Sequence, residues 1–183
     1  MIEVEAKARV KDVALVRQRA LALGEYLGCT IKTDDYYTLE DVKKYPHKSL
    51  RLRRIDKMYQ INFKQSLSFN RRVHAKKETE FTVSNIDDFL ALLKEFGFKK
   101  WLRKEKRSEV YGIARHFQIE LNYLKELGWF AEVEYLAQSE ERKEAEKKVC
   151  TVMKKLGFVE KDFIWKGYTK LLWDARKKDH QRK

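Results

Sequence analysis

Apolar and charged residues alternate along the first stretch of the chain, residues 2–9. Its apolar positions are Ile2, Val4, Ala6 and Ala8, and Glu3, Glu5, Lys7 and Arg9 lie between or after them. Because successive side chains of a strand point to opposite sides, this period of two predicts a strand with one charged face. Further strands are predicted over 29–38, 49–56, 58–66, 73–83, 99–112, 115–123 and 129–137.

Three other stretches place apolar residues at the spacing of a helix. The predicted helices lie within 12–27, 86–96 and 140–156, with Asp12, Asn85 and Ser139 as N-caps and Gly28, Gly97 and Gly157 at their ends. A last short helix is predicted over 162–173. The charged residues 174–183 are predicted to form a frayed tail.

This order of elements lacks the regular alternation of strand and helix that a doubly wound fold requires. It predicts an α+β fold in which a single domain covers residues 1–173. Eight mostly antiparallel strands are enough to form a closed barrel, with the helices packed outside it.

Several predicted strands carry a dense charged face opposite an apolar one. These faces contain Glu3, Glu5 and Lys7; Arg51 and Arg53; Lys76, Glu78 and Glu80; Arg103, Glu105 and Arg107; and Glu132 and Glu134. In a closed barrel they would line the interior, where uncompensated charge is too costly for a dry core. One interpretation is a wet tunnel that binds a polyanion through Arg and Lys and a divalent metal through carboxylates. The other is an open sheet whose charged faces are solvated.

The composition limits the kinds of partner and metal that the chain is expected to bind. The 183 residues include 41 Lys and Arg against 28 Asp and Glu, and the net charge of +13 favours an anionic partner. No apolar run approaches the ~20 residues of a membrane helix and no secretory signal is visible, so we expect a cytoplasmic protein that does not bind a membrane. Two cysteines and four scattered histidines argue against a disulfide scaffold and a zinc site, which leaves a hard metal held by carboxylates.

Short motifs in order along the chain resemble those of the CYTH superfamily, the triphosphate tunnel metalloenzymes. They are E-x-E-x-K at 3–7, Asp35-Tyr36-Tyr37, Leu50-Arg51-Leu52-Arg53, Phe63-Lys64, Lys76-x-Glu78-x-Glu80, Lys106-Arg107, LGWFAEVE at 127–134 and Lys166-Gly167-Tyr168. The resemblance extends from residue 1 to about residue 172. One position departs from it: the family usually has Leu-Asp where this chain has Leu121-Asn122, and Glu120 is the predicted substitute for the missing carboxylate.

The resemblance implies a closed eight-stranded antiparallel β-barrel and a set of site residues. Phosphate contacts are expected from Lys7, Arg51, Arg53, Lys64, Lys76, Arg107 and Lys166. Mg²⁺ or Mn²⁺ is expected to bind Glu3, Glu5, Glu132 and Glu134, with Glu120 as a further ligand. The expected catalytic residues are Lys64 as general acid, Lys7 near a terminal phosphate and Glu5 through the metal. Glu78 and Glu80 are expected to orient the basic residues.

Three functions remain open on the sequence. The first is metal-dependent hydrolysis of a triphosphate, above all inorganic tripolyphosphate, with ATP as a weaker substrate. The second is a class IV adenylyl cyclase, which would form cyclic AMP and pyrophosphate from ATP; no element that reads adenine is visible in the sequence. A nucleic-acid-binding module is disfavoured, because cations interleaved with carboxylates on one face bind a phosphate backbone poorly. A homodimer is compatible with each of these functions.

Overall fold

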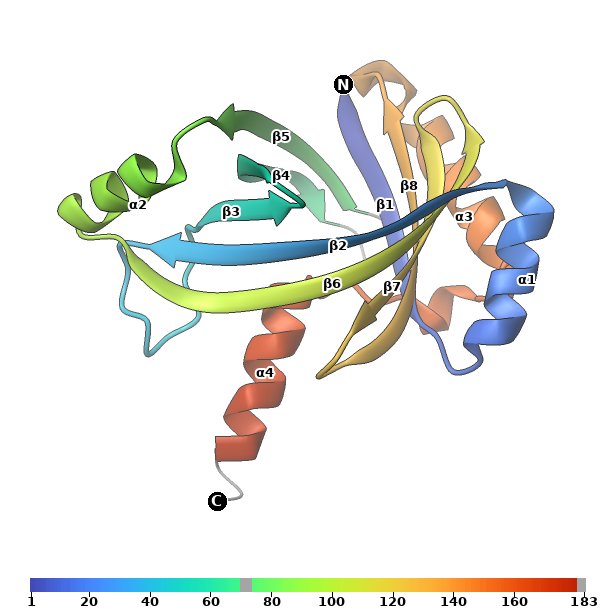
Figure 1. The fold of residues 1–183 in the computed structure, drawn as a ribbon. Coiled ribbons are helices and arrows are strands. Elements are labelled where there is room, and N and C mark those ends of the chain that lie inside the picture. Colours follow the sequence, from blue (N-terminus) through green and yellow to red (C-terminus); the bar gives the residue numbers. More distant parts are fainter. Residues whose placement is uncertain (70–73, 181–183) are drawn as a thin grey trace.

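The computed structural model describes residues 1–69 and 74–180, and it describes the side chains of residues 1–63 and 79–177. Its strands are β1 (Ile2–Arg9), β2 (Glu25–Thr38), β3 (Leu50–Ile55), β4 (Met58–Phe69), β5 (His74–Val83), β6 (Lys99–Ala114), β7 (Phe117–Leu124) and β8 (Gly128–Ala137). Its helices are α1 (Val13–Leu23), α2 (Ile86–Glu95), α3 (Arg142–Lys155) and α4 (Tyr168–His180), with short 3₁₀ turns at Ser139–Glu141 and Glu160–Asp162. Figure 1 shows their arrangement.

All neighbouring strands pair antiparallel, in the order β1-β5-β4-β3-β2-β6-β7-β8. The α+β class and the antiparallel sheet of eight strands are therefore confirmed. β1 pairs with β8 over eight residue pairs but with β5 over only three, at residues 3–5. The closure predicted for the barrel depends on this short ladder between β1 and β5 and stays a prediction.

The main hydrophobic core lies between the outer face of the sheet and two helices. α1 and α3 cover β1, β7 and β8, on the right in Figure 1. Val4 and Ala8 of β1 pack there with Val149 and Met153 of α3, and all four are fully buried. The apolar positions of the alternating pattern thus face the helices, which leaves the charged positions on the inner side of the sheet.

The predicted N-caps form at two of the three helices, but one helix is shorter than predicted. Asp12 accepts a hydrogen bond from the Leu15 backbone N–H, and Asn85 caps α2. α1 ends at Leu23, because the backbone at Gly24 turns extended and enters β2. Leu27, which fits the helical spacing, is an exposed residue of β2.

The C-terminal elements differ from the prediction in position. Residues 163–164 are extended rather than helical, because Phe163 bridges to Ala8 and the Ile164 N–H bonds to the Lys7 carbonyl oxygen at 2.7 Å. α4 begins only at Tyr168 and continues to His180, through residues predicted to fray. Arg176 bonds to Glu126 from this region, which ties the helix to the β7–β8 turn. No helix among the described residues is long and apolar enough to cross a membrane.

Candidate functional site

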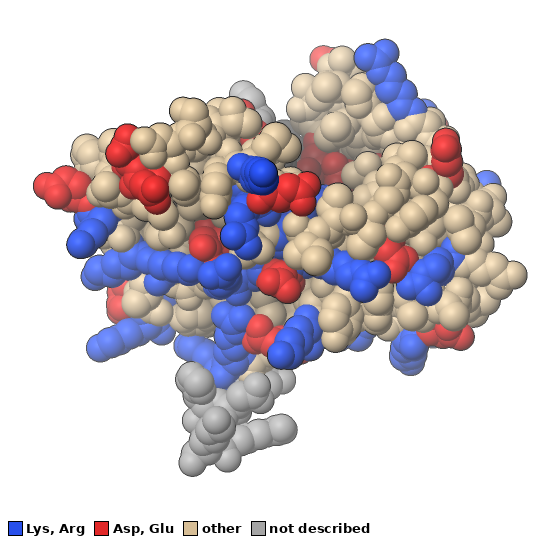
Figure 2. Space-filling view, viewed as in Figure 1, with Lys and Arg blue, Asp and Glu red and all other residues tan. Residues whose placement is uncertain are grey.

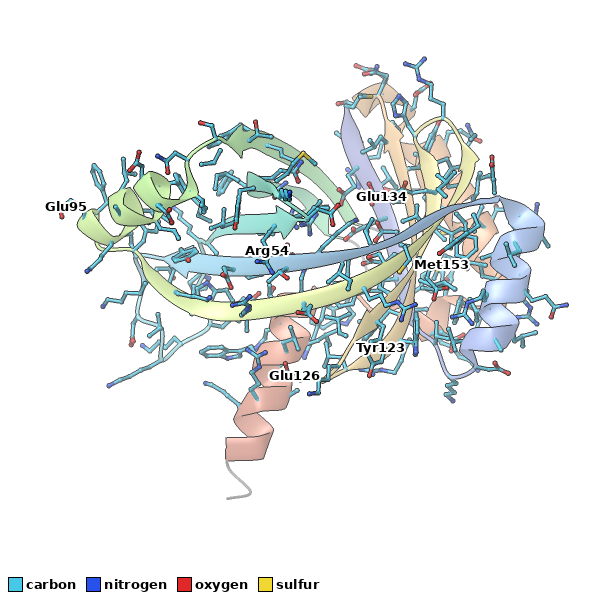
Figure 3. The ribbon with its side chains drawn as sticks, in the orientation of Figure 1. Arg54, Glu95, Tyr123, Glu126, Glu134 and Met153 are labelled. Atoms are coloured by element: carbon cyan, nitrogen blue, oxygen red, sulfur yellow. The ribbon has the colours of Figure 1, made fainter. Side chains whose placement is uncertain are left out.

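A cavity of about 880 Å³ lies on the inner side of the sheet. The charged residues that line it are Glu3, Glu5, Lys7, Lys32, Arg51, Arg53, Glu80, Lys104, Lys106, Glu120, Glu132 and Glu134, with His47 and Lys48 from the loop before β3. Figure 3 shows Glu134 in the middle of the molecule, whereas Glu95 lies at its outer end. Charged residues from β1, β3, β7 and β8 therefore meet around one space, whereas the charged face predicted at Arg103, Glu105 and Arg107 points outward.

Strand register explains why these side chains share one space. Residues that lie opposite each other in antiparallel strands point to the same face. Glu5 lies opposite Glu134, and Lys7 lies opposite Glu132. On the other side of the cavity, Asp34 of β2 lies opposite both Arg53 of β3 and Lys104 of β6. The inward face of each strand is thus continuous with the inward faces of its neighbours.

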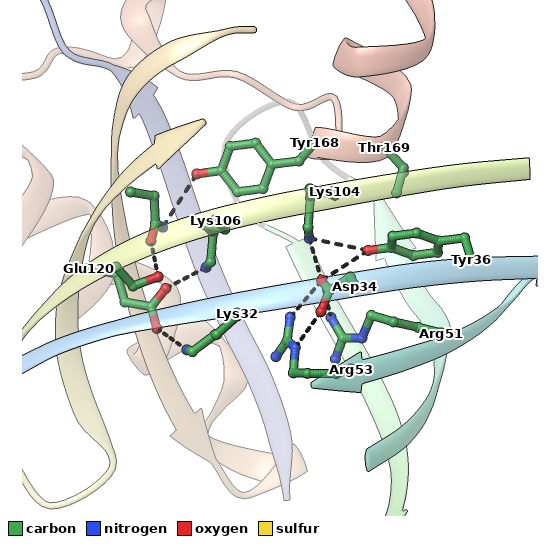
Figure 4. Close-up of polar contacts among 12 residues, drawn as sticks. Lys32, Asp34, Tyr36, Arg51, Arg53, Lys104, Lys106, Glu120, Tyr168 and Thr169 are labelled. Carbon is green, nitrogen blue, oxygen red and sulfur yellow. Dashed lines mark hydrogen bonds and ion pairs between the residues drawn. The ribbon is translucent and has the colours of Figure 1, made fainter. Parts of the chain in front are cut away.

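One end of the cavity is organised around the carboxylate of Asp34, which has no exposed surface (Figure 4). Arg53 donates to it through two nitrogens, Nε at 2.7 Å from Oδ1 and Nη2 at 3.0 Å from Oδ2. Lys104 Nζ lies 2.8 Å from Oδ2, and Arg51 Nη1 lies 4.0 Å from the same oxygen. Three cations therefore surround a single carboxylate, and this group is called the Asp34 cluster below.

The charge of Asp34 is secured by its neighbours. Burial alone would raise the pKa of this carboxyl, but Lys104 and the Arg53 guanidinium outweigh that effect and hold the pKa well below its usual range. In turn, burial lowers the pKa of Arg53 less than its hydrogen bond and charge interaction with Asp34 raise it. Asp34 and Arg53 therefore remain ionised, and the cluster sets three cationic side chains against one carboxylate.

The other end of the cavity is organised around Glu120 and Glu132, which lie opposite each other on β7 and β8. Lys106 Nζ lies 2.7 Å from Glu120 Oε2 and 3.6 Å from Glu132 Oε2. Lys32 donates to Glu120 Oε1 at 3.1 Å, and Lys7 lies 3.7 Å from Glu132 Oε1. These five residues, with Glu3, Glu5 and Glu134, form what is called the carboxylate end below.

Two members of the carboxylate end, Glu120 and Lys106, also stay charged. Burial would raise the pKa of Glu120, but Lys106 and Lys32 hold it well below its usual range. Burial would lower the pKa of Lys106, yet Glu120 and Glu132 raise it above its usual value. Five carboxylates face three lysines here, so this end has a surplus of two negative charges among the side chains the structure describes.

Asn122 joins the carboxylate end to α4. Its side chain is fully buried, accepts a hydrogen bond from Ser108 at 2.6 Å, and donates one to Glu132 Oε2 at 2.6 Å. Its Nδ2 also lies 3.4 Å from the hydroxyl of Tyr168. Burial and the nearby Glu132 raise the pKa of Tyr168 well above its usual value, so this hydroxyl stays protonated.

Aromatic residues line the cavity beside the Asp34 cluster, where the Tyr36 and Trp101 ring centroids lie 5.9 Å apart. Tyr45 and Trp101 both line it, with ring centroids 5.4 Å apart in an edge-on arrangement. The hydroxyl groups of Tyr45 and Thr169 lie 2.8 Å apart, and Trp101 Nε1 donates to Ser49 at 3.0 Å. These bonds hold the loop before β3 against β6 and the start of α4 (Figure 1).

The structure brings together most of the residues predicted for the site. Glu3, Glu5, Lys7, Arg51, Arg53, Glu120, Glu132 and Glu134 all line the cavity. Two predicted residues, Lys64 and Lys76, have side chains outside the described ones. The backbone register places Lys64 opposite Glu78 and Lys76 opposite Glu3.

Two predicted phosphate-binding residues do not line the cavity. Arg107 is exposed and donates to the thiol of Cys29, because the inward positions of β6 are the even-numbered Lys104 and Lys106. Lys166 bonds to Asp174 of α4 at 3.1 Å rather than to a cavity group. Figure 2 shows that Lys and Arg also gather over β2, β6 and α4 on the outer surface, so a basic residue on these strands need not belong to the site.

Sequence reasoning missed four inward residues: Lys32, Asp34, Lys104 and Lys106. Lys106 was quoted within a motif but was passed over for its neighbour Arg107. The signal that could have found them is their spacing: Lys32 and Asp34 lie on the same face of β2 as the buried Tyr36, at every second residue, and lie opposite Lys106 and Lys104. Fixing the inward side of one strand would have fixed it for the other.

The carboxylates of the carboxylate end suit a hard divalent cation by their chemistry, and less well by their present positions. Glu5 and Glu134 lie directly opposite, and Glu3 follows on the same face of β1. Oxygen ligands of this kind are what Mg²⁺ and Mn²⁺ prefer, and two opposed carboxylates gain from a cation between them. Among the described residues, no three acidic, His or Cys side chains already converge on a point that could hold a metal ion.

Comparison with known proteins agrees with this arrangement. The model of the CYTH domain family matches residues 1–168. Among solved structures, the chain is similar to the PH1012 protein from Pyrococcus horikoshii OT3, with 26% identity, a TM-score of 0.78, and coverage of 92% of this chain and 98% of that one. The PH1819 protein from the same organism is 25% identical, with a TM-score of 0.80 and coverage of 94% and 98%.

A more distant similarity concerns the fold. HpAC1 from Hippeastrum, a candidate adenylyl cyclase with a dominant triphosphatase activity, is 16% identical, with a TM-score of 0.62 and coverage of 93% of both chains. At that identity the likeness shows the fold alone. No curated protein matches the chain.

Proposed function

Because this chain belongs to the CYTH domain family, we propose that it is a metal-dependent triphosphatase whose preferred substrate is inorganic tripolyphosphate. The observation that carries the proposal is the division of one cavity into a cationic end, the Asp34 cluster, and a carboxylate end. A triphosphate needs cations along its oxygens and a metal that bridges them, and the two ends offer these two partners to one molecule.

The Asp34 cluster is the proposed phosphate site. Arg51, Arg53 and Lys104 line the cavity and carry more positive charge than Asp34 neutralises. Guanidinium groups bind phosphate oxygens through paired hydrogen bonds, while an ammonium acts as a point charge. We propose that these three side chains hold one part of the substrate and that Lys7 and Lys106 hold the part nearer the carboxylate end.

The proposed metal ligands are Glu3, Glu5 and Glu134, with Glu132 beside them. When bound, Mg²⁺ or Mn²⁺ would neutralise phosphate charge and activate water for attack on a terminal phosphorus. Glu120 is assigned a different role from the one the sequence suggested, because both of its oxygens already accept bonds from lysines. We propose that Glu120 keeps Lys32 and Lys106 charged and fixed in place.

Lys7 is the proposed residue at the reacting phosphate. Its side chain is buried, its ammonium lies 4.3 Å from the centre of the Tyr168 ring, and Glu132 lies opposite it. The ring and the carboxylate limit the positions that the ammonium can take, so it is aimed into the cavity. The general-acid role of Lys64 stays a prediction, since its side chain lies outside the described ones.

One observation favours a second candidate, a class IV adenylyl cyclase. Tyr45 and Trp101 line the cavity beside the Asp34 cluster, and aromatic rings of this kind can contact a nucleobase. These rings are engaged with each other and with Trp173, which is why we place hydrolysis first.

Product analysis distinguishes the two candidates. Purified protein is incubated with tripolyphosphate or ATP, each with Mg²⁺, with Mn²⁺ and with a chelator. The proposal predicts phosphate release that requires the metal, a preference for tripolyphosphate, and similar rates with ATP and GTP. Cyclic AMP and pyrophosphate formed from ATP at a rate comparable with phosphate release would instead establish the cyclase.

A further inference from the structure

Asp34 differs from every other acidic residue of the site in its position. It is fully buried and is not one of the described residues that line the cavity. Its partners Arg51, Arg53 and Lys104 all line it. A group that does not reach the cavity surface cannot contact a bound phosphate. Its influence on the substrate must therefore act through the three cations that do.

The geometry around Asp34 fixes those cations to different degrees. Arg53 is held by two nearly parallel bonds, which set the plane of its guanidinium. Lys104 is held at 2.8 Å and also donates to the Tyr36 hydroxyl at 3.2 Å, and that hydroxyl lies 3.4 Å from Asp34. Arg51, at 4.0 Å, is attracted by the charge without a short bond. One carboxylate thus orients two cations directly and draws in a third.

We propose that Asp34 is a positioning residue, whose buried carboxylate holds Arg51, Arg53 and Lys104 in the arrangement that aligns a bound polyphosphate for attack. The kinetic part of this inference rests on the proposed triphosphatase function. Removing the carboxylate charge should leave three mutually repelling cations free to move apart. They would still attract an anion, and more strongly than before, but they would hold it in the wrong geometry.

The test is the Asp34→Asn variant, which keeps the size of the side chain and removes its charge. Binding of tripolyphosphate, measured by calorimetry without metal, should be unchanged or several-fold tighter. The kcat for tripolyphosphate with Mg²⁺ should fall roughly ten- to a hundredfold, since misplacement by about an ångström can cost that much. Loss of a residue that contacted phosphate itself would weaken binding, and loss of a residue that served only stability would leave kcat unchanged. Neither would lower kcat while binding stayed the same or tightened.

The matched control is Asp35→Asn, the same substitution at the next residue. Asp35 pairs with Lys100 at 2.7 Å and with Arg103 at 3.8 Å on the outer face of the sheet. Its loss should change neither kcat nor tripolyphosphate binding. If Asp34→Asn folds poorly, Tyr36→Phe provides a milder test, because it removes the hydroxyl that bridges Lys104 and Asp34. It should lower kcat by a few-fold, again without weaker binding.

A third readout does not depend on turnover. The Nε–H proton of Arg53 is bonded to Asp34, so its NMR signal should exchange slowly with water in the wild type and in Asp35→Asn, and rapidly in Asp34→Asn. If the wild type hydrolyses no tripolyphosphate, the proposed function fails, and this signal together with the binding data still decides the role of Asp34. The inference is overturned by an unchanged Arg53 signal, by weaker tripolyphosphate binding in Asp34→Asn, or by an undiminished kcat in an active enzyme.

Discussion

The two ends of the cavity are built from the same kinds of side chain but with opposite balance. In the Asp34 cluster, three cations surround one buried carboxylate. At the carboxylate end, Lys106 lies between Glu120 and Glu132, and further carboxylates lie on β1 and β8. At the carboxylate end the lysines and the carboxylates both line the cavity, whereas in the Asp34 cluster only the cations line it and the carboxylate lies buried behind them. A buried ion of one sign can thus organise a surface of the other sign.

The largest expected effect is on stability at the carboxylate end. Lys106→Met leaves Glu120 and Glu132 buried with less positive charge, and breaking such a pair typically costs about 3–5 kcal/mol. Urea unfolding measures this change in the free energy of unfolding. Lys100→Met is the control, because its half-exposed pair with Asp35 should contribute less than about 1 kcal/mol. Equal losses in the two variants would contradict the burial argument.

The next effect separates metal binding from phosphate binding. Glu134→Gln should lower metal-dependent turnover by roughly a hundredfold or more, because it removes a proposed ligand that lies opposite Glu5. Tripolyphosphate binding without metal should be retained, since the loss of a negative charge does not weaken attraction for an anion. Kinetics across a Mg²⁺ titration, with calorimetry in chelator, measures both. Full activity of this variant in Mg²⁺ would refute the assignment of the metal to this end.

A change in the Asp34 cluster should give the reverse pattern. Arg53→Ala removes a charge-assisted phosphate contact worth on the order of 1.5–3 kcal/mol, which is roughly ten- to a hundredfold in kcat/KM. Binding of tripolyphosphate should weaken with and without metal. Arg107→Ala is the control, because Arg107 is exposed outside the cavity, and it should behave as the wild type. If the two arginine variants lose activity alike, the cavity is not the phosphate site.

The smallest expected effect is in acid stability. The pKa of Glu120 is lower in the folded chain than its ordinary value of 4.5, so the unfolded chain binds a proton first. The stabilisation from Glu120 is therefore complete above about pH 4.5 and is lost as the pH falls toward the folded pKa, by at most about 1.4 kcal/mol per pH unit. Unfolding free energies from pH 6 to pH 3 should fall less steeply in Glu120→Gln. Glu144→Gln, at an exposed helix position, is the control.

The alternating pattern predicted β1 and the E-x-E of β8 well, because apolar residues mark their outer side. Val4 and Ala6, like Val133, face the helices and leave Glu3, Glu5 and Glu134 with only one direction to point. Residues 103–107 of β6 are all charged, so no apolar residue distinguishes the inner side from the outer. The motif resemblance placed Arg107 in the cavity, and the local pattern offered nothing to correct it.

Two other errors arose from information that a local pattern does not contain. Asp34 and Asp35 are chemically identical neighbours, and only the pairing of β2 with β3 and β6 decides which one is buried. Leu27 continues the helical spacing of α1, yet β2 has already begun at Glu25 because its ladder with β6 extends to that residue. Long-range pairing overrode the local preference in both cases.

The most direct test of the divided cavity is a pair of crystal structures with Mn²⁺ and tripolyphosphate. One uses the wild type, and the other uses a variant expected to hydrolyse tripolyphosphate slowly, such as Asp34→Asn. Anomalous scattering would locate the manganese, and difference density would locate the phosphorus atoms. The account predicts manganese within coordination distance of Glu5 and Glu134, with phosphates beside Arg51 and Arg53 in the wild type. Manganese at the Asp34 cluster, or phosphates bound on the outer face near Arg103 and Arg107, would contradict it.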